Sequence, residues 1–248
     1  PHAELKVPGD SIAELKARQE WARATEASAS SIAFAAMVTR LDRDVGRLLA
    51  KLKELGLEDD TLVIFTSDNG AHEEDEKDNA FFKASGPLRG IKRDMYEGGM
   101  RVPFLARWPG RIAAGRTTGH VAAFWDFLPT AAELAGVPVP PSAGDGLSYL
   151  PDLLGKDGQR QHGHLYWELL IKAQGRQAAR VGDWKAVRYG QDAPIELYNV
   201  QADPGETTNE ASREPGRVAQ FTQLFHEART DSPDFPLRLP AGVNNSNN

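Results

Sequence analysis

Two side chains that could bind a cation stand side by side after a short apolar run. Residues 62–66 read LVIFT, and Ser67-Asp68-Asn69-Gly70 follows them directly. Ligands of open α/β sheets bind beyond the carboxyl ends of strands, where Asp68 and Asn69 would offer a carboxylate and an amide oxygen to a hard cation. The same tetrapeptide is also ordinary turn chemistry, so both interpretations stay open on these residues alone.

A glycine-rich segment farther along the chain could hold an anion. Residues 86–104 read GPLRGIKRDMYEGGMRVPF and carry the cations Arg89, Lys92 and Arg93. Glycines let the backbone approach a ligand closely, and a lysine beside a metal site would offset the charge of a bound anion. Exposed lysine and arginine side chains are, however, more often simply solvated.

Histidines give weaker signals for acid–base chemistry. His2 could act as a general acid near a leaving group, His72 could contact a substrate beside the Asp-Asn pair, and His120 is a similar candidate. The acidic run EEDE at 73–76 could attract a cation, but a solvated loop face is the better interpretation.

The composition excludes several kinds of site. The chain has 248 residues, no cysteine and a net charge of -6. It therefore holds no disulfide, thiolate metal ligand or cysteine nucleophile, and no basic patch favours a nucleic-acid partner. We expect no membrane segment, because no apolar run has the roughly 18–20 residues that a spanning helix needs.

Periodicity predicts the elements that must position these residues. Apolar residues at three- and four-residue spacing indicate a long amphipathic helix over 31–55, and a buried strand follows at 62–66. A second strand is expected at 102–108, after a long loop over 71–99. With a helix at 126–135, these elements predict an α/β fold with a mostly parallel sheet flanked by helices.

The second part of the chain has a different pattern. After a Pro/Gly-rich linker at 138–146, short aromatic and β-branched stretches separated by turn residues predict a small antiparallel sheet. A helix over 218–229 would cover this sheet with an apolar face made of Phe221, Leu224 and Phe225. We therefore predict an α/β core part, a small antiparallel α+β subdomain and a disordered tail, over residues 1–146, 147–230 and 231–248.

On three long motifs in order, the chain resembles the type I sulfatases of the alkaline phosphatase superfamily. These motifs are LVIFTSDNG, GPLRGIKRDMYEGGMRVPFLARWPGRI and FWDFLPTAAELAGVPVP, and the later GDWKAV and ELYNVQADPGE are similar to that family's carboxyl-terminal subdomain. The resemblance implies a partial alkaline-phosphatase-like core that hydrolyses the sulfate ester of a small molecule or carbohydrate. It also implies a periplasmic or secreted location.

The resemblance implies roles for individual residues. Asp68 and Asn69 match an Asp-Asn pair that helps to hold a divalent cation, usually Ca²⁺. Lys92 matches a lysine that contacts the sulfate, and His2 resembles a histidine near the leaving-group oxygen.

The family's nucleophile is a formylglycine made from the Cys or Ser of a Cys/Ser-x-Pro/Ala-x-Arg motif. The chain has no cysteine, and we expect no serine form of this motif either, so the formylglycine and the other acidic ligands would lie upstream of Pro1. The chain would then be the carboxyl-terminal portion of a sulfatase, inactive alone. Two alternatives stay open: a phosphodiesterase or phosphonate hydrolase of the same superfamily, and a non-catalytic binding module that retains the fold's second half.

Overall fold

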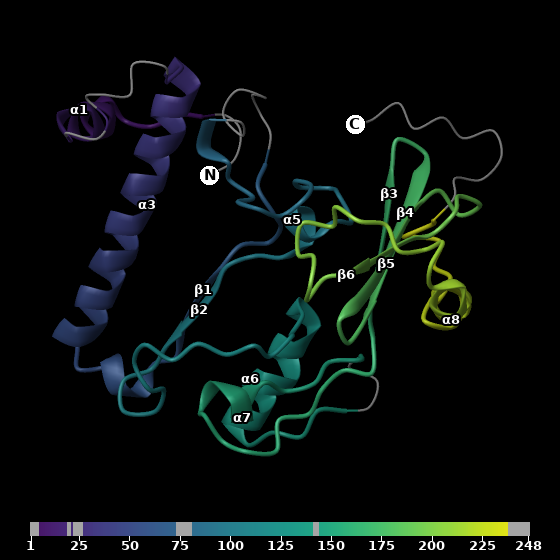
Figure 1. Ribbon diagram of the computed structural model, residues 1–248. Helices are drawn as coiled ribbons and strands as arrows, with labels where there is room; N and C mark the ends of the chain where they lie inside the picture. The colour runs from purple at the N-terminus through teal and green to yellow at the C-terminus, as the bar shows by residue number, and fades with distance from the viewer. Residues whose placement is uncertain (1–4, 19–20, 22–26, 73–80, 141–143, 238–248) are drawn as a thin grey trace.

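The computed structural model describes residues 5–18, 21, 27–72, 81–140 and 144–237. Within these ranges the chain forms a first part with long and short helices around a two-stranded ribbon, and a second part built on a four-stranded sheet (Figure 1). None of the helices in these ranges is both long and apolar enough to cross a membrane.

The predicted long amphipathic helix is confirmed as α3 (Ala29–Glu54). It begins where the Ser28 hydroxyl accepts a hydrogen bond from the Ser31 N–H (3.0 Å), which satisfies one of the unpaired donors of the first turn. Helix α1 (Gly9–Ala17) packs against the first turns of α3, and its Leu15 is buried in this contact. Farther along, α3 is less covered, and Leu48 is 67% exposed.

The strand predicted after this helix is β1 (Val63–Thr66), and it pairs with β2 (Phe104–Arg107). The turn η1 (Glu58–Asp60) joins α3 to β1. The α/β fold class is confirmed, but the two strands of the ribbon pair antiparallel rather than parallel. Parallel neighbours need a crossover connection, usually a helix packed on the sheet. In the described part of their connection the helical pieces are short, and the longer of them is α5 (Glu97–Met100).

The predicted small antiparallel sheet is confirmed as a meander. Its strands follow one another in the order β3 (Leu165–Ile171), β4 (Gln174–Val181), β5 (Trp184–Tyr189) and β6 (Glu196–Asn199). Helix α8 (Pro215–Glu227) covers one face of it, as predicted, with Phe221 and Phe225 buried against the sheet.

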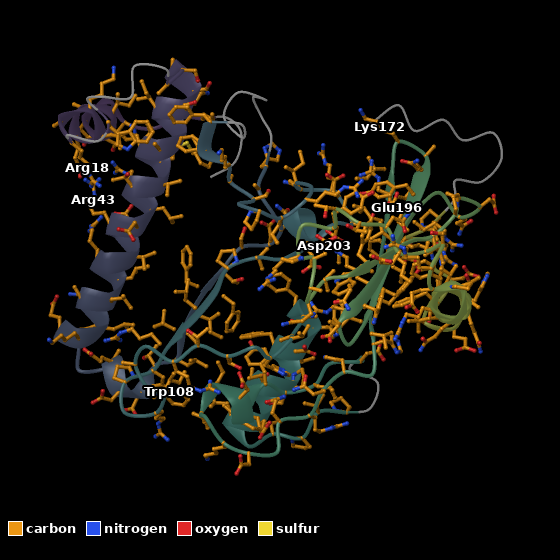
Figure 2. All side chains as sticks on the ribbon, in the orientation of Figure 1. Arg18, Arg43, Trp108, Lys172, Glu196 and Asp203 are labelled. Carbon is orange, nitrogen blue, oxygen red and sulfur yellow. The ribbon has the colours of Figure 1, made fainter. Side chains whose placement is uncertain are left out.

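The other face of this sheet packs against the glycine-rich segment of the first part. Val187 and Tyr198 share a buried cluster with Met95 and Tyr96, which immediately precede α5. Helix α5 accordingly lies between one end of the β1–β2 ribbon and the four-stranded sheet (Figure 1). Figure 2 labels Glu196, the first residue of β6, at the four-stranded sheet. The predicted domain boundary near residue 146 stays a prediction, and this cluster joins residues from both sides of it.

Short helices connect the two sheets along the chain. They are η2 (Phe124–Asp126), α6 (Phe127–Ala135) and α7 (Leu150–Leu153), and α6 ends as predicted at Gly136, which has φ 67°. The Asp126 carboxylate is fully buried and accepts a hydrogen bond from the Leu147 N–H (2.8 Å), and its two oxygens lie 2.9 and 3.0 Å from His162 Nε2. It thereby ties the chain after the linker to the start of α6.

Candidate functional site

The turn after β1 lies directly against the glycine-rich segment. The Gly70 N–H donates to the Gly99 carbonyl (2.9 Å), and the Lys92 N–H donates to the Ala71 carbonyl (2.8 Å). A Cβ atom at Gly70 would lie 1.8 Å from the Gly98 carbonyl oxygen. Gly70, Gly98 and Gly99 are not among the residues with positive φ, so glycine is required here by the closeness of the two backbones.

This backbone contact brings the predicted Asp68-Asn69 pair next to the segment that carries Lys92. Asp68 is exposed and Asn69 is half-buried in the turn that follows β1. The Asn69 amide nitrogen donates to the Gly70 carbonyl (2.9 Å), which leaves the amide oxygen outside that hydrogen bond. The Ser67 hydroxyl donates to the Asn69 carbonyl (3.0 Å) and holds the turn from the other side. The geometry therefore places two oxygen-bearing side chains in a turn that contacts the segment carrying Lys92.

The histidines differ in their positions. His72 is half-buried and directly follows Ala71, whose carbonyl accepts the Lys92 N–H; its role as a substrate contact stays a prediction. His2 and the acidic run at 73–76 lie outside the described residues. His120 lies between β2 and η2, where its N–H donates to the Thr118 hydroxyl (3.1 Å) and its Nδ1 is buried without a hydrogen-bond partner in the described structure.

The Asp-Asn pair fits one part of a cation shell. Carboxylate and amide oxygens are the hard ligands that Ca²⁺ prefers, and Ca²⁺ takes about 6–8 of them. In the part of the chain that the structure describes, no group of three or more His, Cys, Asp or Glu residues could hold a metal ion. Asp68 and Asn69 therefore have side-chain oxygens of the kind that a divalent cation binds. Other groups must supply most of the ligands of such a cation.

The expectation that the chain carries no Cys/Ser-x-Pro/Ala-x-Arg motif is wrong. The stretch Ser85-Gly86-Pro87-Leu88-Arg89 has this spacing. The Ser85 hydroxyl donates to the Gly90 carbonyl (2.9 Å), whereas the Arg89 guanidinium carbon lies 3.7 Å from the centre of the Tyr96 ring. Because the serine and the arginine are engaged in separate contacts, the geometry supports a structural role for both.

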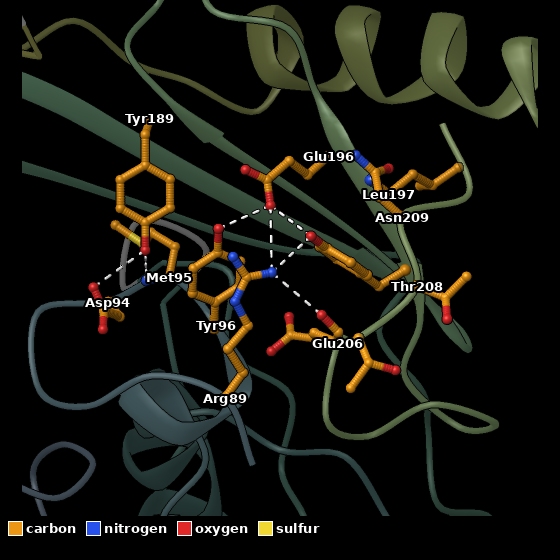
Figure 3. A network of polar contacts seen from close by, with 12 residues as sticks. Arg89, Asp94, Met95, Tyr96, Tyr189, Glu196, Leu197, Glu206, Thr208 and Asn209 are labelled. Atoms are coloured by element: carbon orange, nitrogen blue, oxygen red, sulfur yellow. Dashed lines mark hydrogen bonds and ion pairs between the residues drawn. The ribbon is translucent and has the colours of Figure 1, made fainter. Parts of the chain in front are cut away.

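Arg89 belongs to a polar network that surrounds Tyr96 (Figure 3). The Tyr96 hydroxyl donates to Glu196 Oε2 (2.8 Å), and the Tyr198 hydroxyl donates to the same oxygen. Arg89 donates to the Tyr198 hydroxyl (2.9 Å) and to the Glu206 carbonyl (3.2 Å). Burial and the hydrogen bond to Glu196 raise the pKa of Tyr198, which keeps its hydroxyl protonated. The network ties the glycine-rich segment to β6 and to the chain that follows it.

A buried ionic cluster also joins the glycine-rich segment to the second sheet. Lys185 Nζ lies 3.0 Å from Glu97 Oε1 and 3.1 Å from Glu206 Oε1. The Glu97 N–H donates to Glu206 Oε2 (2.6 Å). Burial raises the pKa of the Glu206 carboxyl, and the neighbouring Lys185 ammonium and Glu97 N–H oppose that shift.

Sequence reasoning missed this cluster, although one signal pointed to it. Lys185 alternates with Val187 and Tyr189 along β5, so the period of a strand places it on an inward face. A fully buried lysine is rare unless it is paired. The pattern could therefore have shown that Lys185 needs acidic partners, but it could not have identified them.

The sequence matches two family models. One is described as Sulfatase and matches residues 13–137, and the other is described as N-sulphoglucosamine sulphohydrolase, C-terminal, and matches residues 91–229.

Curated relatives agree with these matches. Human arylsulfatase A is 37% identical over 216 residues, which cover 78% of this chain and 42% of the relative. N-acetylgalactosamine-6-O-sulfatase of Bacteroides thetaiotaomicron is 31% identical over 211 residues, which cover 78% of this chain and 41% of the relative. The chain thus spans less than half the length of these relatives.

Solved structures share the fold. Ps i-CgsB in complex with k-i-k-neocarrahexaose matches with a TM-score of 0.77 at 26% identity, over 92% of this chain and 48% of that one. Phosphonate monoester hydrolase SpPMH from Silicibacter pomeroyi matches with a TM-score of 0.64 at 24% identity, over 81% of this chain and 40% of that one. The second likeness bears on the fold alone.

Proposed function

This chain belongs to the sulfatase family, and on that premise we propose that it supplies one side of the active site of a sulfate-ester hydrolase. Asp68 and Asn69 bind one side of a divalent cation, Ca²⁺ by our expectation, and Lys92 contacts the sulfate. The observation that carries this proposal is the contact between Gly70 and Gly99, since it sets the Asp-Asn turn against the segment of Lys92.

The chemistry of these side chains suits sulfate transfer. When bound, the cation polarises the sulfuryl oxygens as a Lewis acid. The Lys92 ammonium offsets the negative charge that spreads over the transferring group. His2 protonates the oxygen of the departing alcohol, a role that rests on the family resemblance, and the nucleophile is the formylglycine of that family.

The relatives support a sulfated carbohydrate as the substrate class. The name of the Bacteroides relative specifies an N-acetylgalactosamine 6-O-sulfate activity, and the structure of Ps i-CgsB contains k-i-k-neocarrahexaose. A small sulfated molecule is the other substrate class that we propose, because the arylsulfatase relative is similar to this chain over the same share of its length. Substrates of this kind favour a periplasmic or secreted protein.

Two observations favour other functions. The phosphodiesterase or phosphonate hydrolase alternative stays open, because this chain shares its fold with the phosphonate monoester hydrolase SpPMH and a shared fold does not decide the transferred group. The separate contacts of Ser85 and Arg89 favour a non-catalytic binding module.

Turnover of matched esters by a complemented protein tests the proposal. The complemented protein is a fusion. It joins the portion of the Bacteroides N-acetylgalactosamine-6-O-sulfatase that this chain does not match to the amino terminus of this chain, before Pro1. With Ca²⁺ present, we expect 4-nitrophenyl sulfate to be hydrolysed roughly 10²-fold faster than 4-nitrophenyl phosphate, because the site is built to recognise one transferring group. Asp68→Ala should abolish this activity, and the chain purified alone should show none.

The other outcomes identify the alternatives. Faster turnover of the phosphate ester would assign the chain to a phosphohydrolase. A folded complemented protein that binds Ca²⁺ but hydrolyses neither ester would indicate a binding module. Multiple turnovers by the chain alone, lost in Asp68→Ala, would show that these residues contain a complete active site.

A further inference from the structure

We propose that Lys185 and Glu206 are positioning residues for the candidate site, which they support from the second sheet through the backbone of Glu97. Their effect on catalysis rests on the proposed function, whereas their effect on the geometry of the site does not. Neither residue belongs to the segments that carry the predicted ligands, and Lys185 lies 88 positions after Glu97 in the sequence.

The first step is the ionic cluster itself. Lys185 is fully buried and pairs with Glu97 at 3.0 Å and with Glu206 at 3.1 Å, and both carboxylates are also buried. Glu206 additionally accepts the Glu97 N–H (2.6 Å), so the backbone of Glu97 as well as its side chain is fixed. Arg180 lies 4.0 Å from the other carboxylate oxygen of Glu97 and offsets part of the remaining negative charge. Removing Lys185 would leave two buried carboxylates without their shared cation, which strongly disfavours this arrangement.

The second step leads from Glu97 to the site. Glu97 is followed directly by Gly98 and Gly99, and the Gly99 carbonyl accepts the hydrogen bond from Gly70. The Gly98 N–H donates to the Arg89 carbonyl (2.7 Å), which holds the same backbone from the other side. An added Cβ would lie 2.2 Å from the Gly90 carbonyl oxygen at Gly98, and 2.3 Å from the Asp94 carbonyl oxygen at Gly99. Backbones packed this closely cannot shift independently, so a displacement of Glu97 must move the partner of Gly70.

The third step is that an ionic cluster fixes this geometry more narrowly than an apolar contact would. Buried ion pairs add little net stability compared with well-packed apolar side chains of similar volume. They do, however, require their charged atoms to stay within hydrogen-bond distance. We infer that the cluster's contribution here is to select one position of Glu97 relative to β5.

The same strand offers a matched control. Arg188 is also buried on β5, but on the face that packs against α8, where its Nε donates to Gln177 Oε1 (3.1 Å) and its guanidinium lies 4.9 Å from the centre of the Phe225 ring. Lys185→Met and Arg188→Met therefore remove a buried cation from opposite faces of one strand and introduce the same side chain.

Hydrogen exchange of this chain, measured by mass spectrometry, distinguishes positioning from general stability. In Lys185→Met, we expect exchange in peptides that contain Gly70 and Gly99 to accelerate at least about tenfold, because local openings become less costly there. Peptides of α8 should keep the exchange rates of the unmodified chain. In Arg188→Met, the α8 peptides should accelerate and the peptides of the site should not.

Uniform acceleration in both variants, or unchanged exchange around Gly70 in a folded Lys185→Met chain, would overturn the proposal. If Lys185→Met does not fold, Glu206→Gln decides by the same criteria, since it keeps the side-chain volume and an acceptor for the Glu97 N–H. The measurement needs no turnover, so absence of sulfatase activity would refute the proposed function and leave this result standing.

Discussion

The amide nitrogen of Gly70 lies 2.9 Å from the carbonyl oxygen of Gly99, and this hydrogen bond joins the turn after β1 to the glycine-rich segment. The contact holds the turn that carries Asp68 and Asn69 directly against the segment that carries Lys92.

Gly70→Ala should disrupt this joint. The new Cβ would lie 1.8 Å from the Gly98 carbonyl oxygen, so the two backbones must separate. We expect a loss of about 1–3 kcal/mol in the free energy of unfolding, as for other overpacked sites, measured by urea denaturation. The control is Gly46→Ala, since Gly46 lies within α3 with open space around its Cβ position. That change should stabilise the chain by roughly 0.5–1 kcal/mol, and a similar loss in both variants would contradict the role of the close contact.

The chain alone should bind Ca²⁺ weakly. Asp68 and Asn69 supply only part of a shell, so we expect a dissociation constant no tighter than about 10⁻⁴ M by isothermal titration calorimetry. Asp68→Asn should weaken binding further, because it removes a charged ligand. Submicromolar binding by the unmodified chain would show instead that these residues form a complete site.

Lys92→Ala should impair the complemented protein. We expect kcat/KM for 4-nitrophenyl sulfate to fall by roughly 10²–10³, the loss typical of removing one preorganised charge-stabilising group. Lys53→Ala makes the same chemical change at an exposed position of α3 and should leave the kinetics unchanged. Unchanged kinetics in a folded Lys92→Ala protein would exclude Lys92 from the mechanism.

Asp203 should contribute stability that depends on pH. Its carboxylate accepts the N–H groups of Thr207 (2.7 Å) and Thr208 (2.9 Å), and it lies in the turn that leads to Glu206. Burial opposes the charged form, but these hydrogen bonds and one from the Thr207 hydroxyl (3.1 Å) together prevail and lower the pKa of Asp203. The stabilisation is therefore fully present above the unfolded-state pKa of about 3.9 and is lost as the pH falls through the lower folded-state pKa.

Asp203→Asn should consequently cost roughly 1 kcal/mol at pH 7 and progressively less below about pH 4. Urea denaturation at a series of pH values measures both effects, and Asp157→Asn, at an exposed turn position, serves as the control. A loss in Asp203→Asn that does not change with pH would mean that its carboxylate charge is not the stabilising feature.

Local sequence pattern was sufficient for most elements and for the position of the turn that holds Asp68 and Asn69, whereas their role as metal ligands rests on the family resemblance and stays a prediction. The helical spacing of apolar residues predicted α3, and the alternating stretches with their turn residues predicted the meander of β3 to β6. The run before Asp68 and Asn69 predicted a strand that ends just before them, and this is where β1 ends. These features depend on interactions between residues a few positions apart, which a sequence displays directly.

Only the tertiary structure decided how these elements meet. The strands β1 and β2 pair antiparallel, and the Ser85–Arg89 match to a nucleophile motif is divided between separate contacts. Glu97 meets Lys185 and Glu206, which stand 88 and 109 positions away along the chain. The sequence by itself determined most of the segments that are helices and strands, although it did not indicate the helix α1 (Gly9–Ala17). Which of them come together depends on how distant backbones close on one another, and at Gly70, Gly98 and Gly99 that closeness is possible only because no side chain intervenes.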